Sequence, residues 1–454
     1  MGYSTVRRIM REGLTDPRNL DGIALWNSTR DVTDLTTDTG IKLWADKSGN
    51  SSTNVLCLNG VAGNYASAPD SAALSITSDV RLEWYGALVS WASGSRQVIL
   101  SKYNSTGNQR GYWLAVTATG ALEFIQSTDG TAASTFTSST TLGLSAFAAK
   151  WVRATLDVDN GAAGRTVTFE TSDDGVTWSA LGTAQTVATA ANTFDSTAVL
   201  NVGGNDAGAF NLPVGIVYRA RIYSTPLGTP ALQFDANFSL PAKLAPSFTE
   251  SSSNAATVTI NTSGATGARI SGARDLYQGT AANQPILTIA AAGNYLTFDG
   301  SNDYLKAAAF ALAQPETVYF VGSQVTWTSG DAFFDGNALG NGMAVAQNSL
   351  TPALSLFAGT QISDLIAPAL NARSVISAVF SGAASFLRLN RAAAASASVG
   401  VESGNGFTLG CVRNTTGFAN ITAQEVLVYS GAHDKATQER VIAMLARNNR
   451  IALT

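Results

Sequence analysis

Carboxylate spacing is the first test of whether this chain could cleave a polysaccharide. A retaining glycosidase needs two carboxyl groups about 5 Å apart, one as nucleophile and one as acid, and alternate residues of a β-strand share one face. The sequence has no Glu-x-Asp-x-Glu string, which would supply such a pair. Asp157 and Asp159 have the i, i+2 spacing, but Asn160 and Gly161 follow them. A turn at the end of a strand is the favoured interpretation, so we expect no catalytic residues.

Histidine and cysteine are too few for most other catalytic sites. His433 is the single histidine, so any Ser-His-Asp or Cys-His nucleophile would have to use it. One histidine and two cysteines cannot assemble a zinc site of several such ligands. We predict that Cys57 and Cys411 are small buried apolar residues rather than a disulfide.

Sugar recognition would require planar aromatic side chains beside fixed polar groups in a shallow groove. Aromatic and polar residues alternate closely over residues 102–113, and a weaker set spans 327–335. A place in the core is the competing interpretation for the aromatic members, including Tyr112, Phe333 and Phe334. The candidate glycan-binding residues are Tyr103, Asn104, Arg110, Trp113, Trp327 and Asp335.

The composition restricts the partners of the chain. Charged residues make up 13% of the 454 residues, about half of the ~25% of an average globular protein. The net charge of −4 leaves no broad basic surface, so we expect no nucleic-acid partner. No apolar run approaches the ~18 residues of a membrane span, so we expect no membrane insertion.

The local pattern predicts an all-β fold. Short runs rich in β-branched and aromatic residues recur between clusters of Gly, Asn, Asp and Ser, as in RQVILSK at 96–102 and WVRATLDV at 151–158. This pattern is typical of antiparallel sandwiches. Residues 171–178 (TSDDGVTW) also fit the pattern T-x-D-x-G-x-x-W, called an Asp-box, which we interpret as a hairpin device.

Helix is expected only at the two ends. Residues 434–447 place Val441, Met444 and Leu445 on one stripe after a helix start at His433 and Asp434. Residues 1–22 contain a short basic amphipathic segment that cannot bury its apolar stripe alone. We predict that it anchors the protein to an assembly through Val6, Arg7, Arg8, Ile9, Met10 and Arg11.

An internal echo indicates two copies of one sandwich. The string AGNY occurs at 62–65 and at 292–295, and VYRARIYS at 217–224 resembles QEVLVYS at 424–430. We therefore predict an anchor at 1–22, a first sandwich at 23–230 and a second at 282–454 with the C-terminal helix. Residues 231–281, rich in Ser, Thr and Ala, form a connector that can pair with either sandwich.

Two motifs resemble concanavalin A-like, laminin G-like jelly rolls. LWADKSGN at 43–50 is similar to the W-x-D-x-S-G-N opening of such domains, and FDGSNDYL at 298–305 is similar to the hairpin that follows it. The second copy lacks the opening and the first lacks the hairpin. The end of the chain, EVLVY at 425–429 followed by a helix, resembles these domains in virion proteins of tailed bacteriophages.

The resemblance implies two tandem jelly-roll sandwiches that bind glycans, bind proteins, hydrolyse β-glucans or only build a particle. Laminin G-like domains often hold one calcium ion, for which Asp299, Asn302 and Asp303 are the candidates, with Asp46 and Asn50 a weaker set. Turn-forming roles explain both sets without an ion, and we expect no other cofactor.

The expected function is that of a non-enzymatic virion structural protein, made in the host cytoplasm and oligomeric in the particle. Its sandwiches would contact host-surface glycans, as part of a tail, a fibre or a capsid, and its other partners would be virion proteins. The alternatives are a scaffold or decoration protein that touches only other virion subunits and, third, a glycan-active hydrolase.

Overall fold

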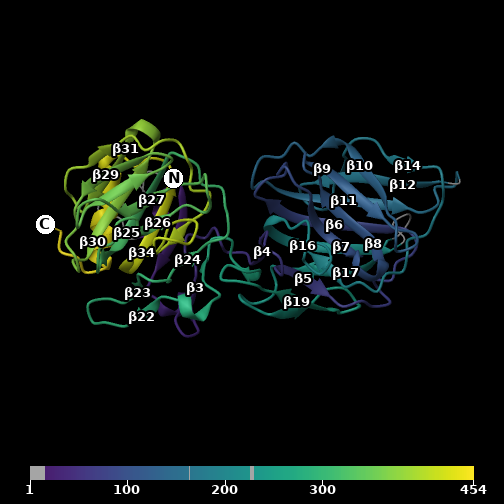
Figure 1. Ribbon diagram of the computed structural model, residues 1–454, viewed down its shortest axis with the longest axis horizontal. Coiled ribbons are helices and arrows are strands. Elements are labelled where there is room, and N and C mark those ends of the chain that lie inside the picture. Colours follow the sequence, from purple (N-terminus) through teal and green to yellow (C-terminus); the bar gives the residue numbers. More distant parts are fainter. Residues whose placement is uncertain (1–15, 163, 225–229, 454) are drawn as a thin grey trace, which may run out of the picture. The chain divides into compact units, whose positions relative to one another are not determined.

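The computed structural model describes residues 16–162, 164–224 and 230–453, which form two compact units. Thr53–Ser271, the inserted unit, interrupts the composite unit, which joins the described part of Met1–Ser52 to Gly272–Thr454. Figure 1 shows both as β-structures. The predicted anchor residues Val6, Arg7, Arg8, Ile9, Met10 and Arg11 lie outside the described residues.

The inserted unit is built from two antiparallel sheets around one core. Sheet I has the order β13 (Ser179–Ala180), β12 (Arg165–Ser172), β11 (Ala149–Asp157), β6 (Val80–Leu88), β16 (Val214–Ser224), β4 (Val55–Asn59), β20 (Arg269–Ser271), with β14 (Gln185–Val187) on β12 and β17 (Ala231–Asn237) on β16. Sheet II has the order β10 (Ser134–Thr141), β9 (Ala121–Gln126), β8 (Gln109–Val116), β7 (Gln97–Asn104), β15 (Leu200–Val202), β5 (Tyr65–Ala68), β19 (Thr257–Asn261), β18 (Ser247–Thr249).

The composite unit is a second two-sheet sandwich with its own core. Sheet III has the order β22 (Ile286–Thr288), β23 (Tyr295–Asp299), β34 (Asn420–Ser430), β25 (Glu316–Gln324), β30 (Ser374–Phe380), β31 (Ser385–Leu389), β32 (Ala395–Ala397), with β1 (Ile23–Ser28) on β34. Sheet IV has the order β2 (Leu35–Thr37), β3 (Ile41–Trp44), β21 (Leu276–Tyr277), β24 (Leu305–Lys306), β33 (Thr408–Leu409), β26 (Ala332–Asp335), β27 (Ala344–Gln347), β28 (Leu354–Phe357), β29 (Gln361–Ile366).

The two units repeat one topology, which confirms the all-β, two-sandwich fold class. The run β12-β11-β6-β16-β4 in sheet I has the same connectivity as β31-β30-β25-β34-β23 in sheet III. The echo between residues 217–224 and 424–430 therefore marks equivalent strands, β16 and β34. The AGNY echo does not, because it precedes β5 in sheet II of one unit and β23 in sheet III of the other.

The insertion corrects the sequence-based boundaries. Residues 23–28 were assigned to the first sandwich, 23–230, but β1 pairs with β34 of the composite unit. Of the connector 231–281, the part up to Ser271 pairs with the inserted unit through β17, β19 and β20. Only residues from Gly272 onward belong with 282–454. The order of the segments along the chain does not reveal these boundaries, because strands that pair with each other can lie far apart in the sequence.

The two jelly-roll motifs belong to the same unit. Trp44, in the tryptophan-led opening, and Phe298, in the FDG hairpin, are both fully buried in the composite core. The second strand of the hairpin, β24, is linked to the strand of Trp44 in sheet IV, where β3 pairs with β21 and β21 pairs with β24. Each apparent copy lacked one motif because the inserted unit separates the opening from its hairpin.

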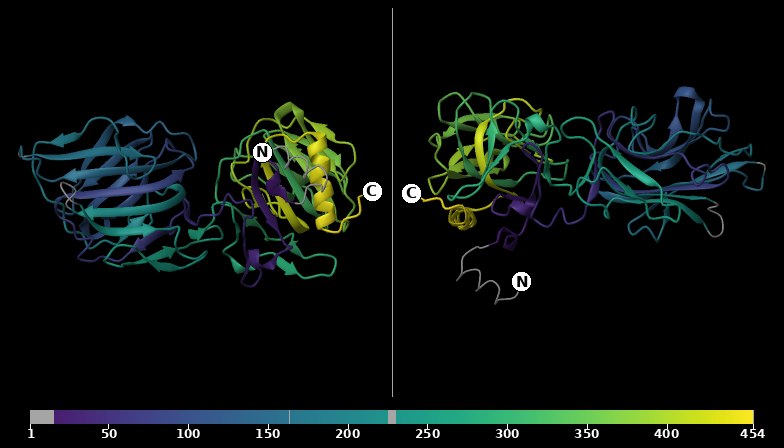
Figure 2. Two further views of the ribbon diagram at one scale, coloured as in Figure 1. Left: turned by 180° about the vertical axis from the view of Figure 1, so that it is seen from behind. Right: turned by 90° about the horizontal axis from the view of Figure 1, so that it is seen from below.

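The C-terminal helix covers one face of sheet III (Figure 2). This helix, α2 (Lys435–Asn448), begins after Asp434, whose side chain accepts a bond from the Thr437 N–H at 2.7 Å. This cap confirms the predicted helix start. The buried residues between helix and sheet are Trp26, Tyr319, Val321, Val375, Leu427, Tyr429, Val441, Ile442, Met444 and Leu445.

Short 3-10 turns span Pro17–Asn19, Val32–Asp34, Thr106–Asn108, Ala281–Asn283 and Gly382–Ala384. Cys57 and Cys411 are both free and buried, as predicted. None of the helices in the described ranges has the length and apolarity that a membrane span requires.

Glu316 generates a prediction about pH. Its carboxyl is buried in β25, where burial raises its pKa to about 8 and one oxygen accepts a bond from the Gly404 N–H. The folded chain therefore keeps this proton at pH values where the unfolded chain has lost it. We predict that the free energy of unfolding of the composite unit falls as pH rises from about 6.5 to about 8, by up to about 1.4 kcal/mol per pH unit.

Denaturant unfolding of the wild type and of Glu316→Gln across this range checks the prediction. The variant should lack the fall. His433 acts with the opposite sign and mainly below this window, because burial lowers its pKa from 6.5 to about 4 and its effect on stability falls largely between those two values. A slope that persists in Glu316→Gln would contradict the assignment.

Candidate functional site

The outer face of sheet I carries an ordered set of charged and aromatic side chains. Along β6, Leu82 and Trp84 are fully buried in the core. Alternation along a strand sends Arg81, Glu83 and Tyr85 to the opposite face. The neighbouring strands β11, β12, β16 and β17 contribute to the same face, because their residues are in direct register with those of β6 or with each other.

One row of this face crosses five strands with alternating charge. In order along the row, the register pairs Glu170 of β12 with Arg153 of β11, then Glu83 of β6, Arg221 of β16 and Asp235 of β17. We call these five residues the charge row. The nitrogen–oxygen distances between successive members are 2.5, 3.8, 3.5 and 3.7 Å. Opposite charges that face each other across strands stabilise a sheet.

Arg219 reinforces one end of the charge row. Its guanidinium bonds both oxygens of Asp235, from Nε at 2.6 Å and from Nη2 at 2.5 Å. This two-point geometry fixes both groups more firmly than a single contact does. The Asp235 backbone N–H also donates to Glu250 Oε2 at 2.9 Å.

Aromatic rings form a second row beside the charge row. Tyr85 is stacked between Trp151, at 5.0 Å and 9°, and Tyr218, at 4.7 Å and 26°. Trp178 meets the edge of Trp151 at 6.3 Å. We call these four residues the ring row. Tyr85, Tyr218 and Trp178 are half-buried, and Trp151 is 6% exposed.

Arginines join the two rows. The guanidinium of Arg153 lies 4.1 Å from the ring centre of Trp178, and that of Arg221 lies 4.8 Å from Trp151. Cations over aromatic faces are attracted by the ring quadrupole. Arg153 and Arg221 therefore have two kinds of partner each, which restricts their rotamers.

Burial and charge oppose each other at Glu83. Burial raises the pKa of its carboxyl, while Arg221, Arg153 and Arg81 lower it. Burial likewise lowers the pKa of Arg81, and the nearby charge of Arg153 adds to that effect. The face holds four arginines, at 81, 153, 219 and 221, against three carboxylates, at 83, 170 and 235, so it carries one net positive charge when all are ionised.

The Asp-box hairpin supports the ring row from one side. Asp174 accepts bonds from the N–H groups of Val176 and Thr177 at 2.8 and 2.7 Å, and these bonds lower its pKa to about 2. Gly175 has φ of +70°, and a Cβ there would lie 2.7 Å from the ring of Trp151. The hairpin is thus packed against the ring row, in line with its structural interpretation.

The first predicted glycan set is brought together only in part. Tyr103 and Trp113 are neighbours, with ring centres 4.5 Å apart, but they are 9% and 5% exposed and belong to a small core cluster. Asn104 accepts a bond from the Thr106 N–H, and Arg110 donates to Gly130 O at 3.1 Å. These contacts stabilise the hairpin, and a glycan contact of the four residues stays a prediction.

The second predicted glycan set is not an open site. Asp335 is fully buried and accepts bonds from the backbone of Met343 and from the backbone and guanidinium of Arg413. This corrects its assignment, because no ligand can displace those partners without leaving a buried charge unpaired. Trp327 is half-buried and donates to Ala353 O at 3.4 Å. Phe333 and Phe334 lie in the core.

The calcium candidates lie in a tight turn. Asp299 accepts bonds from the Ser301 and Asn302 N–H groups, and Asp303 accepts one from the Asp299 N–H. Burial raises the pKa of Asp303 to about 6. Asn302 Oδ1 is buried without a hydrogen-bond partner. Within the described ranges no cluster of three or more His, Cys, Asp or Glu could hold a metal, so calcium here stays a prediction.

The weaker calcium set is occupied by backbone contacts. Asp46 accepts bonds from the Trp26 and Ser48 N–H groups, at 2.9 and 3.0 Å, and Asn50 donates to Ile23 O. Asp157 and Asp159 act similarly as turn residues, since Asp157 accepts from the Asp159 N–H and Asp159 from the Gly161 N–H.

Sequence reasoning missed the charge row and the ring row. The available signal was charge or aromaticity at alternate positions, in Arg81-x-Glu83-x-Tyr85, Trp151-x-Arg153 and Arg219-x-Arg221-x-Tyr223. Each segment alone predicts only a strand with one solvated face. Which segments are neighbours, and in which register, is decided by the sandwich.

No family model and no curated protein matches the chain. Among solved structures, it is similar to domains LG4-5 of the mouse laminin α1 chain, with 13% identity, TM-score 0.31 and coverage of 83% of each chain. It is also similar to the CBM40 of the Ruminococcus gnavus IT-sialidase bound to α2,3-sialyllactose, with 17% identity and TM-score 0.27, covering 36% of this chain and 88% of that one.

A third similar structure is domain 4 of AbnA, a GH43 arabinanase from Geobacillus stearothermophilus, in complex with arabinotriose. It has 11% identity and TM-score 0.30, with coverage of 37% of this chain and 83% of that one. Because these TM-scores are below 0.5, the function proposed below rests on the residues of this chain.

The charge row makes a prediction about stability. Arg221 is 17% exposed and lies between Glu83 and Asp235, which are almost fully buried. We predict that Arg221→Met lowers the free energy of unfolding of the inserted unit by roughly 2–3 kcal/mol, because it leaves two buried carboxylates with less compensation. Denaturant unfolding at neutral pH measures the change.

Lys150→Met is the matched control, since Lys150 pairs with Asp173, whose side chain is 89% exposed. Such a surface pair should contribute less than about 1 kcal/mol. Equal small losses in both variants would show that the charge row does not stabilise the sheet.

Proposed function

We propose that this protein is a non-enzymatic binding protein that contacts a glycan through the outer face of sheet I. The observation that carries the proposal is the side-by-side placement of the charge row and the ring row on one half-open sheet face. Glycans offer many hydroxyl groups, and charged side chains held in fixed positions bind hydroxyls with little loss of conformational entropy. The tyrosine hydroxyls and ring edges add polar and apolar contacts on the same face.

The same geometry supports a role without hydrolysis. Glu83 and Glu170 lie two strands apart, about 10 Å by strand spacing, but Arg153 occupies the row between them. A glycosidic bond would have to lie in that space for the two carboxylates to act on it. The proposal therefore treats these carboxylates as groups that hold the arginines.

We extend the proposal to a virion, in which other virion subunits are the protein partners and the particle is oligomeric. Support for this extension comes from the resemblance of residues 425–429 and the helix that follows to phage virion proteins. The basic amphipathic stripe at residues 6–11 is the proposed tether to the assembly.

Glycan binding is tested with the full-length chain on a glycan array, followed by titration of the ligands found. Tyr85→Phe removes only a hydroxyl and leaves the ring stack. We expect it to weaken binding about 2- to 10-fold, which corresponds to one hydrogen bond. Thr137→Val is the matched control, because Thr137 is an exposed residue of β10 in the other sheet.

Equal glycan affinity of the wild type and Tyr85→Phe would show that the glycan does not bind to the outer face of sheet I. Absence of glycan binding, together with fixed-ratio assembly with other subunits, would favour the bare scaffold. Release of reducing sugar that Glu83→Gln abolishes would favour the hydrolase.

The tether is tested by deleting residues 2–15. The deletion stops before Pro17, whose carbonyl oxygen accepts a bond from the Tyr429 hydroxyl at 3.1 Å, so the composite unit keeps this contact. We expect both units to unfold as in the wild type while the protein is lost from the particle. A deletion variant that is incorporated normally would contradict the tether.

A further inference from the structure

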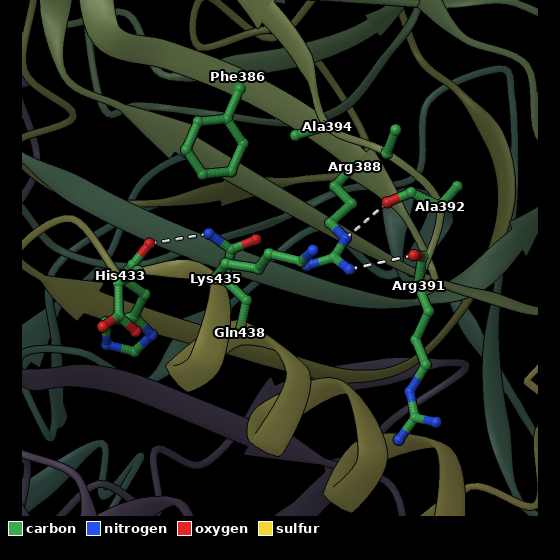
Figure 3. A pocket seen from close by; sticks show the side chains of 10 residues that line it. Phe386, Arg388, Arg391, Ala392, Ala394, His433, Lys435 and Gln438 are labelled. Carbon is green, nitrogen blue, oxygen red and sulfur yellow. Dashed lines mark hydrogen bonds between the residues drawn. The ribbon is translucent and has the colours of Figure 1, made fainter.

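A pocket of about 500 Å³ opens beside the start of α2 in the composite unit (Figure 3). It lies between β31, the turn at residues 390–394 and the first two turns of the helix. Its size is within the range of small-molecule sites. The lining residues that the argument uses are Phe386, Arg388, Arg391, His433, Lys435 and Gln438.

Arg388 is held rigidly in this pocket. It is 3% exposed, and its guanidinium donates from Nε to Ala392 O at 2.8 Å and from Nη2 to Arg391 O at 3.1 Å. Figure 3 shows these two bonds to the turn. The carboxylate of Glu439 lies 3.4 Å from Nη2. The turn carbonyls are neutral, so much of the positive charge of this buried group is compensated only by Glu439.

Gln438 presents a hydrogen-bond acceptor that has no donor. Its side chain is 1% exposed, and its Nε2 donates to His433 O at 2.8 Å. This bond fixes the amide orientation, so Oε1 is the atom left over, and it is buried without a hydrogen-bond partner. An unpaired buried acceptor costs about 1–3 kcal/mol. A ligand that donates a hydrogen bond here would recover that free energy.

The charges around the pocket favour an anion with a single charge. Among the lining residues, Arg388, Arg391 and Lys435 are positive and Asp434 is negative, and Glu439 pairs with Arg388, so these five groups leave one positive charge. His433 adds none at neutral pH, because burial lowers its pKa to about 4; its Nδ1 lies 2.9 Å from the Tyr319 hydroxyl.

The ligand must also match the uncharged groups. Phe386 and alanines 392–394 give the pocket an apolar wall. A phosphate dianion would fit poorly, since it has no apolar face for Phe386 and its double charge would be repelled by Asp434 and Glu439. A sugar ring has an apolar face for Phe386 and hydroxyl donors for Gln438, and a carboxylate on that ring matches the guanidinium of Arg388.

We propose that this pocket binds a sugar acid, a pyranose ring carrying one carboxylate. The carboxylate contacts Arg388 with Lys435 or Arg391, a ring hydroxyl donates to Gln438 Oε1, and the apolar face of the ring packs on Phe386. The site lies in the composite unit, and it stands whether or not sheet I of the inserted unit binds a glycan.

The experiment titrates the full-length protein with sodium glucuronate, glucose and inorganic phosphate, using calorimetry or ligand-observed NMR. We expect glucuronate to bind at least 10-fold more tightly than glucose or phosphate. A polymer of glucuronate forms a second arm. If the polymer binds, the ligand of the pocket is a sugar acid within a polysaccharide. If only the monomer binds, the ligand is a free sugar acid.

Three variants test the assignment. Gln438→Met keeps the length of the side chain but removes the acceptor, and Lys435→Met removes a cation whose side chain is 80% exposed, so its folding should be unaffected. Both should weaken glucuronate binding at least threefold. Arg447→Met, an exposed position in the last turn of the same helix, is the control and should change nothing.

Failure of glucuronate to bind, equal affinity for phosphate, or wild-type affinity in Lys435→Met and Gln438→Met would each overturn the proposal. Because these variants lie in the composite unit, their outcome is independent of Tyr85→Phe. Loss of array binding in Tyr85→Phe with unchanged glucuronate affinity would separate the two sites.

Discussion

Register between long antiparallel strands is the constraint on which both units depend. β16 in the inserted unit and β34 in the composite unit are each 11 residues long, and each pairs with three other strands. Side chains alternate between faces with a period of two, so a shift of one residue would exchange the buried and the outer sets on every neighbour. The buried face of β16 fixes Ala220 and Ile222 in the core and thereby aligns Arg219 and Arg221 on the outer face.

The alignment on the outer face of sheet I brings charged residues together in a chain that has few of them. With only 13% charged residues, most outer strand positions carry Ser, Thr or Asn, as in β10 and β19. On the outer face of sheet I, the register pairs charged residues of opposite sign across strands. Partly buried ionic groups such as those of the charge row must be mutually compensated to persist.

The insertion follows from the same constraint. The chain enters the inserted unit just before β4 and leaves it just after β20, and these two strands are paired with each other, with Val55 opposite Ser271. Because entry and exit are adjacent, the composite unit can be interrupted between Ser52 and Gly272 without separating the strands on either side. Domain insertion is tolerated where the ends of the insert lie close together.

The sequence by itself determined the all-β class, the repetition of one sandwich, the helix start at His433 and Asp434 and the burial of Cys57 and Cys411. Each follows from local information: hydrophobic period, capping chemistry or residue type. Only the tertiary structure decided that residues 43–50 and 298–305 serve one sandwich, that Asp335 is a buried partner of Arg413, and that Glu83, Arg153 and Arg221 share a row. The reason is physical: strand pairing and register join residues far apart in the chain, and the free energy of those contacts depends on burial that no local pattern contains.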